Sequence, residues 1–176
     1  MSGSIDNIVL IGMAGVGKST VGVLLAKALH RNFVDTDLVV QSAEGRRLQE
    51  IVDELGKEAF QAIEERHVLS IQIPGAVIAT GGSVVYSKNA MGHLKRTATT
   101  VYLKLPLDQL EARVVNTESR GLAMNSGQSF ADLYGERLPL YERYADVTID
   151  CDGLNHDEVV ATAVTRLLDR SQPYRQ

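Results

Sequence analysis

The sequence predicts an α/β fold with a parallel sheet, and two patterns support this prediction. Short apolar runs alternate along the chain with longer segments whose apolar residues recur at helical spacing, which is typical of α/β proteins. The first run, Ile-Val-Leu-Ile at 8–11, is apolar throughout, which indicates a strand buried on both faces, as in a parallel sheet. With 176 residues and 44% hydrophobic content, the chain can bury one core, so we expect a single domain over 1–176.

Element boundaries follow from the apolar runs and from residues that begin or interrupt helices. Gly45 and Gly56 divide the helical stretch after the second strand into three segments. Ser87 is placed to cap a short helix, and Asn155 with Glu158 resembles a capping pair. The expected strands cover 5–11, 33–37, 77–79, 100–105 and 147–150. The expected helices cover 18–30, 38–43, 48–55, 57–71, 88–96, 106–115, 130–144 and 156–168.

A glycine-rich loop of defined spacing joins the first strand to the first helix. Residues 12–20 read Gly-Met-Ala-Gly-Val-Gly-Lys-Ser-Thr and fit the pattern Gly-x4-Gly-Lys-Ser/Thr of phosphate-binding loops. Glycine lets the backbone direct successive N–H groups at an anion, and the start of the helix adds positive partial charge. We expect Lys18 to reach the terminal phosphates of a nucleotide and the Ser19 hydroxyl to ligate Mg²⁺. The residues expected to bind the nucleotide here are Gly12, Ala14, Gly15, Val16, Gly17, Lys18, Ser19 and Thr20.

Polar and small residues follow the second and third strands, at the edge where ligands of parallel sheets collect. Asp35 and Asp37 end the second expected strand, so we expect them beside the phosphate-binding loop. The other interpretation is a turn that caps the next helix, and one aspartate could do both. Gly81 and Gly82 follow the third strand, where such a pair fits either a turn or a close approach of backbone to a ligand.

Helical periodicity stops between residues 116 and 129, where polar and small residues predominate. A stretch of this kind inside a compact domain is either disordered or a functional lid. Arg120 is its only cation. A lid that closes over a phosphoryl-transfer site would exclude water, which otherwise would accept the phosphate.

Composition narrows the classes of function. A net charge of −4 and a pI near 5.6 argue against a nucleic-acid-binding surface. The apolar runs are too short for a membrane span, and the N-terminus lacks a secretory signal. Cys151 is the single cysteine, for which we expect a buried, reduced thiol, and the four histidines show no metal-ligand spacing. These features fit a cytoplasmic, monomeric enzyme that binds neither nucleic acid nor membranes.

The motifs occur in a recognisable order along the chain. They are the phosphate-binding loop, Asp35-Thr36-Asp37, Phe60 with Glu64, Gly81-Gly82, Arg120, and Glu-Arg-Leu-Pro-Leu-Tyr at 136–141. This order resembles the shikimate kinase family over about residues 7–170. The loop alone is common to many proteins, but its combination with Asp-Thr-Asp and Arg-x-Pro-Leu-Tyr is far more specific.

The resemblance implies a three-layer α/β sandwich of the P-loop NTPase type. Its five-stranded parallel sheet would have the order 2-3-1-4-5, with helices on both faces. It also implies a substrate-binding helical segment at about 37–72 and a mobile lid at about 116–129. The implied reaction uses ATP and Mg²⁺ to phosphorylate a ring hydroxyl, converting shikimate to shikimate 3-phosphate in aromatic amino-acid biosynthesis.

The resemblance further implies roles for single residues. Asp37 matches the residue that contacts substrate hydroxyls and accepts the proton, and Asp35 matches the one that holds Mg²⁺ through water. Arg120 matches the lid arginine that reaches the transferring phosphate, and Arg113 matches the arginine that stacks on adenine. Arg137 matches one of two arginines that bind the substrate carboxylate. The implied catalytic residues are Lys18, Asp37 and Arg120, and the implied substrate-binding residues are Asp37, Gln61, Gly81, Gly82 and Arg137.

Two positions depart from the family pattern. Gln61 stands where the family has the second carboxylate-binding arginine, and Ser83 stands where it has a third glycine. A charge-assisted fork is stronger than a neutral hydrogen bond, so its loss should weaken shikimate binding roughly tenfold to hundredfold unless Arg66 or another cation compensates. At Ser83 a positive φ would be costly.

Three functions therefore remain open from the sequence. The first is shikimate phosphorylation, and the second is a kinase for another small hydroxylated acceptor, for which Gln61 is the discriminating residue. The third is a nucleotide-binding regulatory module that has lost turnover. A GTPase is disfavoured because no Asn-Lys-x-Asp pattern is present, and a nucleoside monophosphate kinase because 116–129 carries one arginine.

Overall fold

The computed structural model describes residues 6–114, 122–125 and 127–171. Within these residues the chain forms one five-stranded sheet of order β2-β3-β1-β4-β5, in which every neighbouring pair of strands is parallel. The parallel sheet and the order 2-3-1-4-5 are therefore confirmed. The strands are β1 (Asn7–Ile11), β2 (Asn32–Asp35), β3 (Ala76–Ala79), β4 (Ala98–Lys104) and β5 (Val147–Asp150).

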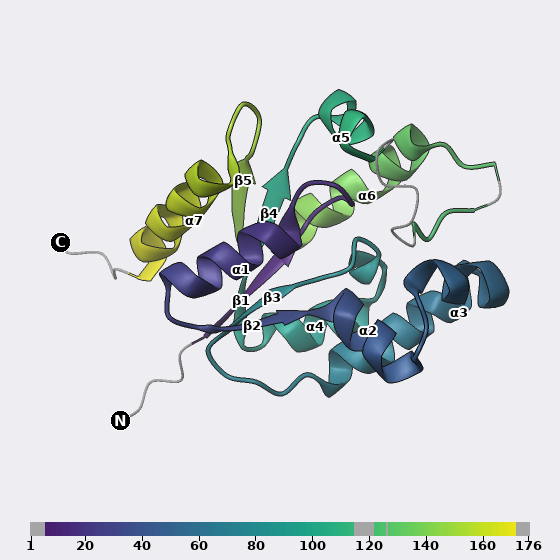
Figure 1. The fold of residues 1–176 in the computed structure, drawn as a ribbon. Coiled ribbons are helices and arrows are strands. Elements are labelled where there is room, and N and C mark those ends of the chain that lie inside the picture. The colour runs from purple at the N-terminus through teal and green to yellow at the C-terminus, as the bar shows by residue number, and fades with distance from the viewer. Residues whose placement is uncertain (1–5, 115–121, 126, 172–176) are drawn as a thin grey trace.

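Helices cover both faces of the sheet (Figure 1). On one face α1 and α7 contact each other, and on the other α4 and α6 contact β4. The pair α2 and α3 packs together beyond the end of β2. The helices are α1 (Lys18–Ala28), α2 (Thr36–Glu44), α3 (Leu48–Ser70), α4 (Lys88–Lys95), α5 (Leu107–Val114), α6 (Phe130–Tyr144) and α7 (His156–Ser171), and a 3-10 turn, η1 (Val84–Tyr86), follows β3.

The core lies around the two central strands. Every residue of β1 and β3 is buried, which confirms the prediction from the apolar run at 8–11. The edge strand β5 alternates between buried and exposed residues instead. Cys151 is buried at the end of β5, and this burial raises the pKa of its thiol to about 11, as expected for an inert cysteine.

Two of the predicted boundaries, the end of β2 and the break at Gly56, are resolved by the structure. Strand β2 ends at Asp35 rather than at Asp37, because Asp35 caps α2: its Oδ1 accepts from the N–H of Asp37 at 2.9 Å and of Leu38 at 3.4 Å. Asp37 lies in the first turn of α2, where a negative charge is favourable. The break expected at Gly56 is confirmed, since its φ of 82° and ψ of 170° are non-helical inside α3.

Asn7 joins the beginnings of two strands, so its loss should destabilise the fold. Its Nδ2 donates to the Ile73 carbonyl at 2.8 Å, and its Oδ1 accepts from the Ala76 N–H at 2.7 Å. Asn7→Ala leaves both backbone groups without these partners, and we expect it to lower the free energy of unfolding by about 2–3 kcal/mol. Urea unfolding measures this, with Asn32→Ala, at an exposed position that begins β2, as the matched control. Equal midpoints for the two variants would contradict the expectation.

Candidate active site

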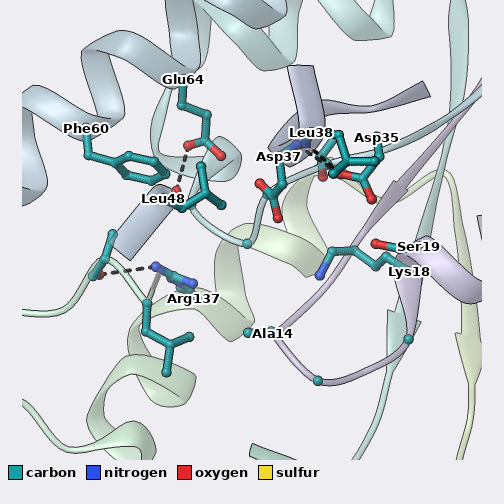
Figure 2. Close-up of a pocket in the computed structure, with 18 of the residues that line it drawn as sticks. Ala14, Lys18, Ser19, Asp35, Asp37, Leu38, Leu48, Phe60, Glu64 and Arg137 are labelled. Carbon is teal, nitrogen blue, oxygen red and sulfur yellow. Dashed lines mark hydrogen bonds between the residues drawn. The ribbon is translucent and has the colours of Figure 1, made fainter. Parts of the chain in front are cut away.

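A cavity of about 360 Å³ lies where β1, β2 and β3 end (Figure 2). The loop after β1, the beginning of α2, the middle of α3, the loop after β3 and α6 all contribute to its wall. The lining residues are Ala14, Gly15, Gly17, Lys18, Ser19, Thr20, Asp35, Asp37, Leu38, Leu48, Phe60, Glu64, Thr80, Gly81, Gly82, Ser83, Leu122, Ala123 and Arg137.

The phosphate-binding loop forms one end of this cavity. A Cβ at Gly12, whose φ is 146°, would lie 2.6 Å from the Leu103 carbonyl oxygen, so only glycine fits there. The buried Lys18 ammonium donates to the carbonyls of Gly12 at 2.7 Å and Met13 at 2.9 Å. These bonds fold the lysine across the mouth of the loop, and Figure 2 shows Nζ pointing into the cavity. The Val16 side chain instead packs in the core.

The two aspartates lie across the cavity from the loop. Asp35, Asp37, Lys18 and Ser19 all line the same space, and Figure 2 shows Asp37 above the Lys18 ammonium and Asp35 near Ser19. The expectation that the acidic pair would lie beside the phosphate-binding loop is therefore met in the geometry. Asp35 combines this position with its capping of α2.

The backbone at Gly81 passes unusually close to two carboxylates. A Cβ there would lie 2.1 Å from Glu64 Oε1 and 2.8 Å from Asp37 Oδ1, so any larger residue would force these carboxylates to move. The Gly81 N–H donates to the buried Thr36 hydroxyl at 2.9 Å, which ties the loop after β3 to the beginning of α2. At Gly82, a Cβ would lie 2.8 Å from Arg137 Nη1.

Glu64 is a buried acid that was not among the predicted site residues. It is 2% exposed, and its Oε2 accepts from the Ser83 hydroxyl at 2.6 Å. Its Oε1 is buried and has no hydrogen-bond partner among the described residues. Burial raises the pKa of Glu64 to about 7, opposed by the Ser83 hydrogen bond and reinforced by the charge of Asp37. The signal in the sequence is a carboxylate at helical spacing between Phe60 and Val68, where an apolar residue is expected.

Ser83 adopts its position without backbone strain. Its φ is −89° and its ψ is −11°, in the right-handed helical region. The cost that a positive φ would carry at this position therefore does not arise, because the chain already turns into η1 here. The serine hydroxyl instead gains a function as the donor to Glu64.

Arg137 places a buried cation in the wall of the same cavity. It is 2% exposed, and its guanidinium donates only at 3.4 Å, to the Tyr86 hydroxyl and to the Ala123 carbonyl. Across the part of the chain that the structure describes, no carboxylate lies within ion-pair distance of it. A buried charge is costly unless it is paired, so this guanidinium is suited to bind an anion that enters the cavity.

The remaining predicted residues lie at or beyond the edges of the cavity. Arg113 lines a second pocket of about 490 Å³, together with Gly15, Gly17, Thr20 and His156, on the far side of the phosphate-binding loop. His156, one of the four histidines without metal-ligand spacing, thus borders this pocket. Arg120, and residues 116–121 and 126 of the expected lid, lie outside the described residues.

Gln61 is not brought to the main cavity. It borders a smaller pocket of about 240 Å³ with Ser83 and Tyr86, and its buried Nε2 has no hydrogen-bond partner among the described residues. Arg66, the first candidate to compensate for the missing arginine, points elsewhere: its side chain is 64% exposed and pairs with Glu44 at 2.5 Å.

The parallel sheet of order 2-3-1-4-5, with its glycine loop, Lys18 and facing acidic pair, defines a P-loop kinase of a small molecule. A model of one such family, described as shikimate kinase, matches residues 14–168. The chain belongs to the shikimate kinase family.

Individual relatives agree with this assignment. A shikimate kinase of Vibrio vulnificus is 35% identical over 168 residues, covering 94% of this chain and 97% of that protein. One from Thermodesulfovibrio yellowstonii is 39% identical over 156 residues, covering 87% and 90%. Among solved structures, shikimate kinase from Acinetobacter baumannii in complex with shikimate gives a TM-score of 0.87 at 28% identity, covering 96% of each chain.

The raised pKa of Glu64 predicts that the free energy of unfolding depends on pH. Because its pKa rises from 4.5 unfolded to about 7 folded, the folded protein binds the proton more tightly. Glu64 therefore stabilises the fold below about pH 4.5, and this contribution is lost as the pH rises through about 7. Glu64→Gln has no such dependence, so its stability relative to the wild type should increase by up to about 3 kcal/mol between those limits. Urea unfolding at several pH values measures the difference, and curves that stay parallel would contradict it.

Proposed function

We propose that this chain transfers the γ-phosphate of ATP to a hydroxyl group of shikimate. The observation that carries the proposal is the buried Arg137 guanidinium, which lines the same cavity as the phosphate-binding loop and has no ion-pair partner among the described residues. A cavity that holds both a phosphate site and a buried cation suits a hydroxylated acid as acceptor. The structural neighbour solved in complex with shikimate supports this choice.

At the phosphate end, the loop N–H groups and Lys18 would hold the terminal phosphates. The ammonium would exchange the loop carbonyls for phosphate oxygens, which are the stronger acceptors. Ser19 and Asp35 supply oxygen donors at the cavity, and such hard donors, together with phosphates and water, fit Mg²⁺. When bound, Mg²⁺ would offset the charge of the phosphates. We assign the second pocket, which Arg113 borders, to the adenine of ATP.

At the acceptor end, Asp37 would orient the attacking hydroxyl. The oxygen of that hydroxyl forms the bond to the γ-phosphorus as the bond to the leaving ADP oxygen breaks, and Asp37 receives the proton of the hydroxyl. Gly81 and Gly82 leave room for the ring, and Arg137 binds its carboxylate. We assign Arg120 to the transferring phosphate, residues 116–129 to a lid and 37–72 to acceptor binding. That the enzyme is cytoplasmic and monomeric remains a prediction.

Among the described residues, no helix is both long and apolar enough to span a bilayer.

The two alternative functions, a kinase for another acceptor and a regulatory module without turnover, are not favoured by the family match.

The test of the proposal is ADP release measured with a panel of small polyols and hydroxy acids. We expect release to depend on an acceptor and to be fastest with shikimate, with shikimate 3-phosphate as the product. A faster acceptor in the panel would reassign the substrate. ATP binding without acceptor-dependent release would overturn the kinase activity itself.

Variants of Asp37 and Lys18, which both line the cavity, should remove turnover without unfolding the protein. Asp37→Asn keeps the shape of the side chain but cannot accept the proton, so kcat should fall by about 10²–10⁴. Lys18→Met should have a similar effect through lost phosphate binding. Asp169→Asn, at an exposed position on α7, is the control and should retain full kcat. Near-normal kcat in either cavity variant would refute its assigned role.

A further inference from the structure

A second cation, the Lys57 ammonium, lies close to Arg137. It is not among the residues predicted for the site. Lys57 is four residues before Gln61 on α3, so the two side chains leave the same face of that helix, one turn apart. Its side chain is only 11% exposed. The missing guanidinium at position 61 is therefore flanked by a mostly buried ammonium.

Lys57 and Arg137 share one aromatic neighbour. The Lys57 ammonium lies 5.0 Å from the centroid of the Tyr86 ring, and the Arg137 guanidinium carbon lies 5.3 Å from the same centroid. Both distances are within the range of cation–π contacts. The Tyr86 ring on η1 thus lies near two positive groups, from α3 and α6, and Arg137 is the one of them that lines the cavity.

The present ion pair of Lys57 is loose. Its Nζ lies 3.8 Å from Glu136 Oε1, which is beyond hydrogen-bond distance, and Glu136 is 41% exposed. The other oxygen of Glu136 accepts from the Gln128 amide at 2.8 Å. An ammonium on a flexible stem that is held this weakly can turn to a better acceptor, such as an incoming carboxylate.

We propose that Lys57 binds the acceptor carboxylate together with Arg137, in place of an arginine at position 61. A carboxylate has two oxygens and can accept from both cations at once. The neutral Gln61 and the exposed Arg66 do not offer this charge. The inference rests on the proposed function, since it assigns a contact to that acceptor.

Steady-state kinetics of Lys57→Met provide the test. We expect the KM for shikimate to rise about tenfold or more, while the KM for ATP stays within twofold. With the carboxamide analogue of shikimate, which lacks the negative charge, wild type and variant should differ little. An unchanged KM for shikimate, or an equal rise with the carboxamide, would overturn the role of Lys57. A wild type that does not phosphorylate shikimate would count against the proposed function instead.

Two further variants separate binding from a structural role. Glu136→Gln removes the resting ion pair but keeps Lys57, so the KM for shikimate should not rise. If it rises as much as in Lys57→Met, the lysine serves only to hold Glu136 and the proposal fails.

Adding Gln61→Arg to Lys57→Met should recover most of the lost affinity for shikimate, whereas Gln61→Arg alone should improve the KM for shikimate less than threefold. Should Lys57→Met unfold, Lys57→Gln replaces it with the same expectation.

Discussion

The hydrogen bond from the Gly81 N–H to the Thr36 hydroxyl organises the site. It joins the segment after β3 to the first residue of α2, and it draws the backbone of Gly81 against Asp37 and Glu64. The next two residues, Gly82 and Ser83, then meet Arg137 and Glu64. A side chain at Gly81 would displace the carboxylates of Asp37 and Glu64. The position of these two carboxylates in the cavity therefore depends on the close approach of this backbone.

Groups of both charges line the cavity. Lys18 and Arg137 contribute cations, and Asp35, Asp37 and Glu64 contribute carboxyl groups. The cations and the loop N–H groups would bind anionic groups, while Asp37 would accept the proton of a hydroxyl group. The raised pKa of Glu64 lessens the repulsion among the carboxyl groups, because a proton on Glu64 leaves one charge fewer beside Asp37.

The sequence could predict those parts of the site that depend on local pattern. The phosphate-binding loop, the capping by Asp35 and the break at Gly56 each follow from residues adjacent in the chain. The order of the strands came only from the family resemblance, since alternation of elements does not specify which strands are neighbours. The negative φ of Ser83 and the cluster around Tyr86 depend on how α3, η1 and α6 pack, which no local pattern contains.

The two departures from the family pattern are better understood together than singly. An arginine at position 61 would lie three residues before Glu64 on one helix, close enough to donate to it as well as to carry charge. In this chain the donor to Glu64 is the Ser83 hydroxyl, at 2.6 Å. Lys57 adds a positive charge near Tyr86, beside that of Arg137. In this chain a serine thus donates to Glu64 and a lysine carries the charge, two tasks that one arginine at position 61 could combine. A glycine at 83 would leave Glu64 without this donor, so Glu64 depends on the serine for its hydrogen bond.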